Sequence, residues 1–317
     1  MKTPSVLVLH NRPDELRPLL DARFEGLTVT YASAPDEVVS ALERARPEVV
    51  FTIKHSGFPG EAHRPAVSFP SVRWVQIGGS GYEHLAPWDS SRVTVTNCHG
   101  VLAPFLAETV MAAIASLNAG LFAYRDRQRA RNWQPTRFRS LAGQTLAVVG
   151  AGAIGTHVAR LARAFGMRVE GVRRCAEAHP DFDAVHSPEA LRAVLARADV
   201  VSVHVRATPE TRRMIDGEAF AAMRPGALFV NTSRGAVVDE PALIDALRSG
   251  RVGAAYLDVF EREPLTPESP LWSMENVLIT PHASDNVADW PLRFAEVFAD
   301  NVDRWRRGEP LRLVVTT

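Results

Sequence analysis

Three short polar segments carry the residue types from which an acid–base site can be built. They are Asn231-Thr232-Ser233-Arg234-Gly235, Asp258–Leu265 (DVFEREPL) and Thr280-Pro281-His282-Ala283-Ser284. Along the chain, Glu263 lies 29 positions after Arg234, and His282 lies 19 positions after Glu263. An imidazole exchanges a proton near neutral pH, a carboxylate can orient it, and a guanidinium binds a carboxylate through paired hydrogen bonds. These residue types therefore fit proton transfer to a small carboxylic acid.

Each segment directly follows a run of residues that is typical of a buried β-strand. Strands and helices alternate along most of the chain, which predicts an α/β protein with doubly wound parallel sheets. Ligands of such sheets bind beyond the carboxyl ends of the strands, so the three segments are expected to share one site. The predicted strands are Ser5–Leu9, Leu27–Tyr31, Glu48–Ile53, Arg73–Ile77, Leu146–Val149, Arg168–Val172, Val200–Val205, Ala227–Asn231 and Gly253–Asp258. The predicted helices are Pro13–Phe24, Glu37–Ala45, Val101–Tyr124, Ile154–Phe165, Pro188–Ala196, Pro241–Arg248 and Pro291–Arg307.

A glycine-rich loop follows one of these strands and has the pattern GxGxxG. In Gly150-Ala151-Gly152-Ala153-Ile154-Gly155, the first glycine permits a tight turn and the second lets the backbone approach a pyrophosphate. Gly155 lets the following helix pack on the sheet, and the N-terminus of that helix offers free N–H groups to phosphates. The alternative is an ordinary strand–turn–helix corner, but the flanking strand and helix favour a dinucleotide site.

The residues after the next strand indicate which dinucleotide is bound. A site for NAD usually places an acid about 20 residues beyond the glycines. Glu170 lies at that distance but in the middle of the predicted strand, whereas Arg173 and Arg174 stand at its end. Two guanidiniums suit a 2′-phosphate, so the sequence favours NADP(H), with NAD(H) also possible. The alternative is two surface arginines in an arginine-rich chain.

Composition excludes several classes of partner. The 317 residues include 36 basic and 36 acidic side chains, so no net field attracts nucleic acid or an anionic membrane. Only Lys2 and Lys54 are lysines, and the other 34 basic residues are arginines. The two cysteines, Cys98 and Cys175, form neither a metal-ligand pattern nor a disulfide framework, which predicts no metal site and a cytoplasmic location. The apolar stretch 101–124 carries Pro104, Glu108 and Asn118, which disfavours a membrane span.

In sequence order, these motifs resemble those of the D-isomer-specific 2-hydroxyacid dehydrogenase family. The matching motifs are GSGYEHL and then the AE of FLAET in the first half, followed by GAGAIG, HVRATPETRRMI, NTSRGAVVDE, DVFEREPL and TPHAS. The resemblance implies a Rossmann-type cofactor domain at residues 99–285. It also implies a flavodoxin-like substrate domain at residues 1–98 and 286–317, with a cleft between the two domains.

The same resemblance implies roles for individual residues. His282 is expected to donate the proton to a keto oxygen, Glu263 to hydrogen-bond and orient His282, and Arg234 to bind the carboxylate and polarise the carbonyl. Ser80 and Gly81 are expected to donate backbone hydrogen bonds to the substrate carboxylate. The residues expected at the cofactor are Gly150, Gly152, Ala153, Ile154, Gly155, Arg173, Arg174, His204, Arg206, Thr208, Thr211, Thr232, Ser233, Asp258 and Ser284.

Some positions leave alternatives open. Arg206 stands where the family commonly has proline, and is either a further phosphate ligand or a surface side chain. Trp133 lies where similar reductases of hydroxypyruvate and glyoxylate send a tryptophan into a neighbouring subunit's site. This predicts a homodimer formed through the 101–124 helix region, but Trp133 could equally be a partly buried anchor. Lys54 and His55 end a predicted strand, either touching substrate or only bordering a loop.

The sequence therefore predicts an NADPH-dependent reductase of small 2-keto acids, most like glyoxylate/hydroxypyruvate reductases, that forms the D-2-hydroxy acid. The alternatives are a dehydrogenase of a bulkier 2-hydroxy acid, and a nucleotide-sensing protein resembling the corepressors of the same family.

Overall fold

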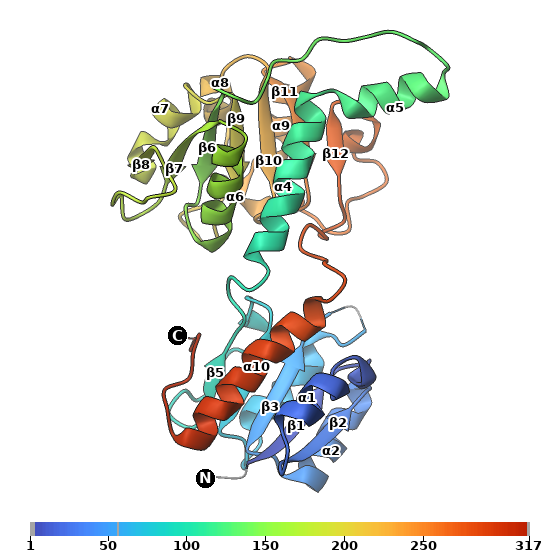
Figure 1. Cartoon of the computed structure of the whole chain (residues 1–317), viewed down its shortest axis with the longest axis vertical. Coiled ribbons are helices and arrows are strands. Elements are labelled where there is room, and N and C mark those ends of the chain that lie inside the picture. The colour runs from blue at the N-terminus through green and yellow to red at the C-terminus, as the bar shows by residue number, and fades with distance from the viewer. Residues whose placement is uncertain (1–3, 56, 316–317) are drawn as a thin grey trace. The chain divides into compact units, whose positions relative to one another are not determined.

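The computed structural model describes residues 4–55 and 57–315, which form two compact units. The first unit comprises Met1–Leu102 and Val287–Thr317, and the second comprises Ala103–Asn286. Each contains one parallel β-sheet flanked by helices (Figure 1). The prediction of two doubly wound parallel sheets is thus confirmed.

The first unit contains a five-stranded sheet in the order β2-β1-β3-β4-β5. Strand residues alternate between two apolar layers: Val6 and Val8 pack with α1 and α10, whereas Leu7 and Leu9 pack with α2 and α3. This alternation is what a strand buried on both faces requires. The strands are β1 (Ser5–Leu9), β2 (Thr28–Ala32), β3 (Val49–Ile53), β4 (Trp74–Gly78) and β5 (Thr94–Thr96). The helices are α1 (Arg17–Arg23), α2 (Val38–Ala45), α3 (Arg64–Ser68) and α10 (Trp290–Arg307).

The second unit contains a seven-stranded sheet in the order β12-β11-β10-β9-β6-β7-β8. Because consecutive strands run outward from β6 in one direction and from β9 in the other, the β6–β9 boundary is a topological switch point, where α/β sheets bind ligands. The strands are β6 (Thr145–Val149), β7 (Arg168–Val172), β8 (Ala184–His186), β9 (Val200–Val203), β10 (Ala227–Asn231), β11 (Val252–Leu257) and β12 (Val277–Ile279). The helices are α4 (Ala103–Asn118), α5 (Leu121–Arg129), α6 (Ala153–Ala164), α7 (Leu191–Leu195), α8 (Gly217–Ala222) and α9 (Glu240–Arg248).

The predicted single helix at 101–124 is wrong. The chain breaks at Ala119-Gly120, where Gly120 has a left-handed φ of 67°, and α4 and α5 meet at 62°. The predicted helix at 13–24 likewise begins as a 3-10 turn, Pro13–Glu15, and becomes α-helical only at Arg17. Within the described residues, no single helix is long and apolar enough to cross a bilayer, although the bent α4–α5 pair passes that test together.

Helix α5 and the following loop form an arm that extends away from the seven-stranded sheet (Figure 1). None of the α5 residues is buried, and Trp133 in the loop is 99% exposed. The arm returns to the sheet at Arg139, whose guanidinium donates to the Asp199 carboxylate at 2.8 Å. Asp199 also pairs with Arg224 and accepts a hydrogen bond from the backbone of Thr145. This mostly buried carboxylate therefore anchors the end of the arm beside β6.

Four imidazoles of the first unit lie in two close pairs. Each has at least one buried ring nitrogen without a hydrogen-bond partner among the described residues. The ring centroids of His10 and His55 are 5.2 Å apart, and those of His63 and His84 are 5.4 Å apart. His63 is fully buried, and neither of its nitrogens has a partner among the described residues. Burial lowers the pKa of all four imidazoles, that of His63 to about 3, and nearby Lys54 and Arg12 add to the effect.

These shifts predict that acid destabilises the first unit. Because the folded pKa of His63 lies below its unfolded value, the unfolded chain takes up more protons as the pH falls below about 6.5. The resulting loss of unfolding free energy from His63 alone is about 2 kcal/mol between pH 7 and pH 5. Urea unfolding followed by tryptophan fluorescence measures it, since Trp74 is fully buried in this unit. His63→Leu should flatten the pH dependence, while His157→Gln in the second unit should not; equal slopes in all three proteins would contradict the assignment.

Candidate active site

His282 and Glu263 form a hydrogen-bonded pair beyond the carboxyl ends of β11 and β12. The imidazole Nδ1 of His282 lies 2.9 Å from Oε2 of Glu263. The other carboxylate oxygen of Glu263 accepts from the backbone N–H of Phe260 at 3.1 Å, which fixes the carboxylate's orientation. Both side chains remain partly exposed, at 45% for His282 and 38% for Glu263. The pairing orients the ring and leaves Nε2 as the nitrogen able to exchange a proton.

The turn that carries His282 is held by the buried carboxylate of Asp258. Oδ1 of Asp258 accepts hydrogen bonds from the hydroxyl of Thr280 and from the backbone N–H groups of Ala283 and Ser284. Its Oδ2 accepts from the hydroxyl of Ser284 at 2.6 Å. Inside this turn, His282 adopts a left-handed backbone with φ of 51°, a conformation that is unfavourable for a non-glycine residue. The Asp258 hydrogen bonds stabilise that conformation.

Arg234 presents an unpaired guanidinium at the same edge of the sheet. It follows β10, and the side chain of Asn231 donates to its carbonyl at 3.3 Å. Its Nη1 donates to the carbonyl of Ser233 at 2.7 Å, and no carboxylate in the described part of the chain lies within 4 Å of it. An exposed guanidinium with free donors can bind an incoming carboxylate through two parallel hydrogen bonds.

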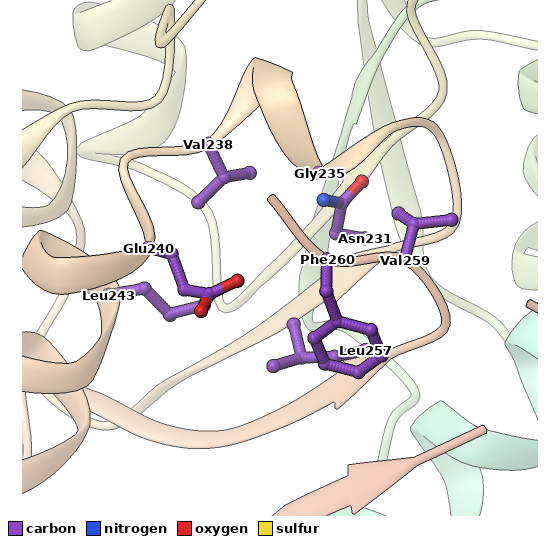
Figure 2. Close-up of a pocket in the computed structure, with 8 residues that line it drawn as sticks. All are labelled: Asn231, Gly235, Val238, Glu240, Leu243, Leu257, Val259 and Phe260. Atoms are coloured by element: carbon purple, nitrogen blue, oxygen red, sulfur yellow. The ribbon is translucent and has the colours of Figure 1, made fainter. Parts of the chain in front are cut away.

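The loops that carry Arg234 and Glu263 touch through their backbones. A Cβ atom on Gly235 would lie 1.9 Å from the carbonyl carbon of Phe260, so only glycine fits there. Beside this contact is a hollow of about 10 Å³, enough for one water molecule. Figure 2 shows it with Glu240 and Leu243 of α9 on one side and Phe260 on the other. The hollow is too small for a substrate. The close approach of the two loops beside it leaves only this small space.

The glycine loop after β6 is packed tightly at its first and third glycines and open at its second. A Cβ atom on Gly150 would lie 2.7 Å from the backbone of His204, and one on Gly155 would lie 2.3 Å from the carbonyl of Gly150. By contrast, nothing lies within 4 Å of a Cβ atom at Gly152, so the chain is open on that side. Gly152 also precedes α6 without a side-chain cap, which leaves the first N–H groups of that helix available to an anion. Ala153 and Ile154 form the first turn of α6, and these residues fit a dinucleotide phosphate.

The charged side chains in and after β7 differ in how many of their hydrogen-bonding groups are already occupied, and therefore in how well they could bind a further phosphate. Glu170 is engaged within the sheet: its carboxylate pairs with Arg197 at 2.6 Å and with His186 at 2.9 Å. The Arg197 hydrogen bond lowers the pKa of Glu170. Arg173 donates to the carbonyl of Cys175 and lies 3.8 Å from Glu177, so its guanidinium is partly occupied by its own turn. Arg174 is exposed. The pKa of the nearby Glu210 carboxyl is lowered mainly by a hydrogen bond from Thr208, and the positive charge of Arg174 adds to the shift.

Residues after β9 and β10 border the glycine loop. Both ring nitrogens of His204 are hydrogen-bonded: Nε2 lies 2.8 Å from the hydroxyl of Ser202, and Nδ1 lies 3.2 Å from the hydroxyl of Thr232. Burial lowers the pKa of His204 to about 3. It is therefore a neutral ring. The hydroxyl of Thr211 donates to the carbonyl of Arg206 at 2.6 Å and packs against Thr208, while the Arg206 side chain is exposed. Ser233 donates to Asn231, which fixes the start of the Arg234 loop.

Two further predicted substrate residues, Ser80 and Gly81, lie in the five-stranded unit, whereas Trp133 lies on the arm of the other unit. Ser80 and Gly81 follow β4 after Gly79, which has a left-handed φ of 121°. The side chain of Asn97 donates to the carbonyl of Ser80 at 2.9 Å, and the backbone of Cys98 donates to the carbonyl of Gly79. These bonds hold the turn through its carbonyls. Lys54 is exposed, and His55 belongs to the imidazole group described above.

One acidic residue beside the turn of His282 was not predicted from the sequence. Asp285 follows the clamped turn and is partly buried. Burial raises the pKa of its carboxyl, and the neighbouring charge of Asp258 raises it further, while His282 and Arg234 oppose the shift. The signal in the sequence was an extra acidic residue three positions after His282. In the described residues, no group of three or more His, Cys, Asp or Glu side chains is arranged to hold a metal ion.

A family model and a curated relative both match this chain over more than half of its length. Residues 111–284 match the family model described as "D-isomer specific 2-hydroxyacid dehydrogenase, NAD binding domain". A glyoxylate reductase from Korarchaeum cryptofilum is 33% identical over 320 aligned residues, which cover 96% of this chain and 94% of that relative.

Solved structures show the same fold over nearly the whole chain. A D-isomer specific 2-hydroxyacid dehydrogenase family protein from Aeromonas salmonicida superposes with a TM-score of 0.88 at 32% identity, covering 99% of each chain. A D-isomer specific 2-hydroxyacid dehydrogenase from Xanthobacter autotrophicus, in complex with NADPH and MES, superposes with a TM-score of 0.81 at 31% identity. That match covers 99% of this chain and 98% of the other.

The backbone contact at Gly235 predicts a severe effect of a single methyl group. Gly235→Ala must push the Arg234 and Glu263 loops apart, and we expect it to lower the free energy of unfolding by about 3 kcal/mol. Urea unfolding measures this change. Gly217→Ala is the matched control, because its new Cβ atom meets only Ala242 at an ordinary 3.8 Å. Equal stability of the two variants would show that the loops are not packed this tightly.

Proposed function

The chain belongs to the D-isomer-specific 2-hydroxyacid dehydrogenase family, whose members are NAD(P)-dependent oxidoreductases, and we propose that it reduces small 2-keto acids to D-2-hydroxy acids. The observation that carries this proposal is the His282–Glu263 pair, 2.9 Å between Nδ1 and Oε2, on the same sheet edge as the unpaired guanidinium of Arg234. Together these groups supply an acid, its orienting base and an anion-binding fork.

The chemistry divides among these side chains as follows. Arg234 binds the substrate carboxylate and draws electron density from the keto oxygen. Protonated His282 gives its Nε2 proton to that oxygen as the carbonyl carbon gains a hydride, and Glu263 stabilises the imidazolium and holds its orientation. The bound nicotinamide supplies the hydride. In the reverse direction, neutral His282 accepts the hydroxyl proton. Ser80 and Gly81, whose turn is held through its carbonyls, donate backbone N–H groups to the carboxylate.

The cofactor in this proposal is preferably NADP(H). Gly150, Gly152 and Gly155, with the open N-terminus of α6, bind the pyrophosphate, and Arg174 with Arg173 binds the 2′-phosphate. The engagement of Glu170 by Arg197 and His186 supports this choice, since the carboxylate at the spacing typical of NAD sites is already paired and is not free to accept from a ribose hydroxyl. The NADPH complex of the Xanthobacter relative is consistent with it.

The substrate class and assembly are also proposed. The similarity to a glyoxylate reductase supports glyoxylate and hydroxypyruvate as substrates, with bulkier 2-hydroxy acids as the alternative. We place a homodimer interface at α4 and the α5 arm, because the arm exposes Leu121, Phe122, Trp133 and Phe138. Trp133 would then complete the neighbouring subunit's site. The domains divide near residues 98 and 286, with the substrate domain discontinuous.

A substrate panel tests the proposed function. NADPH oxidation should be measured with glyoxylate, hydroxypyruvate, pyruvate and phenylpyruvate, and we expect turnover with the first two. Tight NADPH binding without turnover of any 2-keto acid would contradict the proposal and favour a nucleotide-sensing protein.

Removing the proton donor should abolish turnover without removing the cofactor. His282→Ala is expected to lower kcat by about 10²- to 10⁴-fold, the usual contribution of a positioned acid. Fluorescence titration should give an unchanged Kd for NADPH, because the His282 side chain has no part in the proposed phosphate contacts. A kcat within threefold of the wild-type value would remove His282 from its proposed role.

The two arginines after β7 should set the cofactor preference. The double variant Arg173→Ala with Arg174→Ala should weaken NADPH binding by about 10- to 100-fold, as expected for lost charge-assisted hydrogen bonds, and change NADH binding little. Arg168→Ala, an exposed arginine at the opposite end of β7, is the control and should change neither. Equal losses for NADPH and NADH in the double variant would refute the assignment.

A further inference from the structure

The turn after β4 is tied to the segment after β5 through two consecutive carbonyl groups. The carbonyl of Gly79 accepts from the backbone N–H of Cys98 at 2.7 Å, and the carbonyl of Ser80 accepts from the side-chain amide of Asn97 at 2.9 Å. Because β4 and β5 are adjacent and parallel, the two segments emerge at the same edge of the five-stranded sheet. Both carbonyls of the turn therefore point toward the segment that follows β5.

The direction of these carbonyls fixes the direction of the next two N–H groups. The N–H of Ser80 shares a peptide with the carbonyl of Gly79, and the N–H of Gly81 shares one with the carbonyl of Ser80. Both peptides are trans, and in a planar trans peptide the N–H points opposite to the carbonyl. The two N–H groups therefore point away from Asn97, and neither has a hydrogen-bond partner among the described residues. Consecutive N–H groups that face one way form a surface suited to an anion.

Asn97 is held through all four of its hydrogen-bonding groups. Its N–H donates to the carbonyl of Leu313 in the C-terminal segment at 3.0 Å, and its carbonyl accepts from the side chain of Gln76 at 3.0 Å. Its side-chain oxygen accepts from the backbone N–H of His99 at 3.2 Å, which leaves the amide nitrogen as the atom that faces Ser80. Since Asn97 is only 7% exposed, its amide cannot turn toward water without breaking these bonds.

We propose that Asn97 is a positioning residue, which holds the Ser80 carbonyl so that the N–H of Gly81 faces the substrate carboxylate beside the N–H of Ser80. This inference rests on the proposed function, in which those two N–H groups bind the carboxylate. Glycine flanks Ser80 on both sides, so the backbone itself has little preference for one direction of this peptide. Without the amide of Asn97 the peptide is free to rotate, and the N–H of Gly81 loses its fixed direction.

Asn97→Ala tests the proposal through the division of its effect between KM and kcat. A turn that no longer presents both N–H groups binds the carboxylate more weakly in the ground state and the transition state alike, which raises KM and leaves kcat nearly unchanged. We expect KM for glyoxylate and for hydroxypyruvate to rise about tenfold, the effect of losing one hydrogen bond to a charged group. The Kd for NADPH should not change. A merely structural role would reduce the fraction of folded protein, which lowers kcat and leaves KM unchanged.

Two further variants support the interpretation. Asn97→Asp keeps the shape of the side chain and the hydrogen bond from His99, but an ionised carboxylate cannot donate to the Ser80 carbonyl. KM should therefore rise here as well, and the rise should persist in high salt, which screens the added charge. This variant replaces Asn97→Ala if that protein does not fold. Ser71→Ala is the matched control, because it removes a side-chain hydrogen bond of 2.8 Å to the carbonyl of Pro47 at the opposite end of the same sheet. It should change neither KM nor kcat.

The outcomes separate the two proposals. If the wild-type protein turns over 2-keto acids and a folded Asn97 variant keeps the wild-type KM, with or without a fall in kcat, the role of Asn97 alone is overturned. We also expect a crystal structure of Asn97→Ala to show the Ser80 carbonyl turned from its wild-type direction, and an unturned carbonyl overturns the same role. Wild-type protein that reduces no 2-keto acid overturns the proposed function, and this inference with it.

Discussion

The hydrogen bonds accepted by Asp258 are the interaction on which the rest of the site depends. This carboxylate is 1% exposed, and a buried charge of this kind is tolerated only when its oxygens are satisfied. Donors from Thr280, Ala283 and Ser284 satisfy them, so the carboxylate and the turn stabilise each other. Hydrogen bonds to a charged group contribute about 1.5–3 kcal/mol each, enough to hold His282 at its left-handed φ of 51°. The orientation of the imidazole toward Glu263 is thus established before any substrate arrives.

The parallel sheet explains why residues so distant along the chain meet. β10, β11 and β12 are adjacent and parallel, so the segments after them emerge at one edge of the sheet. The contact between Gly235 and Phe260 then locks the Arg234 loop against the Glu263 loop. The proposed function depends on this packing, because the proposed proton donor and the proposed anion-binding guanidinium must be positioned together to act on one substrate.

The sequence was informative where a residue type has few structural uses. The motif GxGxxG was correctly predicted to lie between a strand and a helix, and its role as a dinucleotide loop stays a prediction. The Arg234–Glu263–His282 series was correctly expected to lie after strands of one sheet. The sequence was less informative where long-range hydrogen bonds decide. The cofactor contacts expected of Asp258 and Arg173 stay predictions. The sequence did not show that the Asp258 carboxylate also holds the turn of His282, or that Arg173 donates within its own turn. The raised pKa of Asp285 was not predicted, because burial and the charge of Asp258 act on its carboxyl only in the folded chain. The break at Gly120 was missed because the apolar periodicity continues through it. The edge strands β5, β8 and β12 are each only three residues long, which gives their sequences too short a pattern to recognise.

Transfer of deuterium from cofactor to substrate is the most direct test of the central claim, that this site reduces a 2-keto acid by hydride transfer. Hydroxypyruvate would be reduced with NADPH carrying deuterium at C4 of the nicotinamide, and the product examined by NMR and chiral chromatography. The account predicts glycerate with one deuterium at C2 and only the D configuration. No formation of glycerate would contradict the account. Glycerate that lacks deuterium at C2 would also contradict it, if the deuterium is missing both with cofactor labelled on one face of C4 and with cofactor labelled on the other.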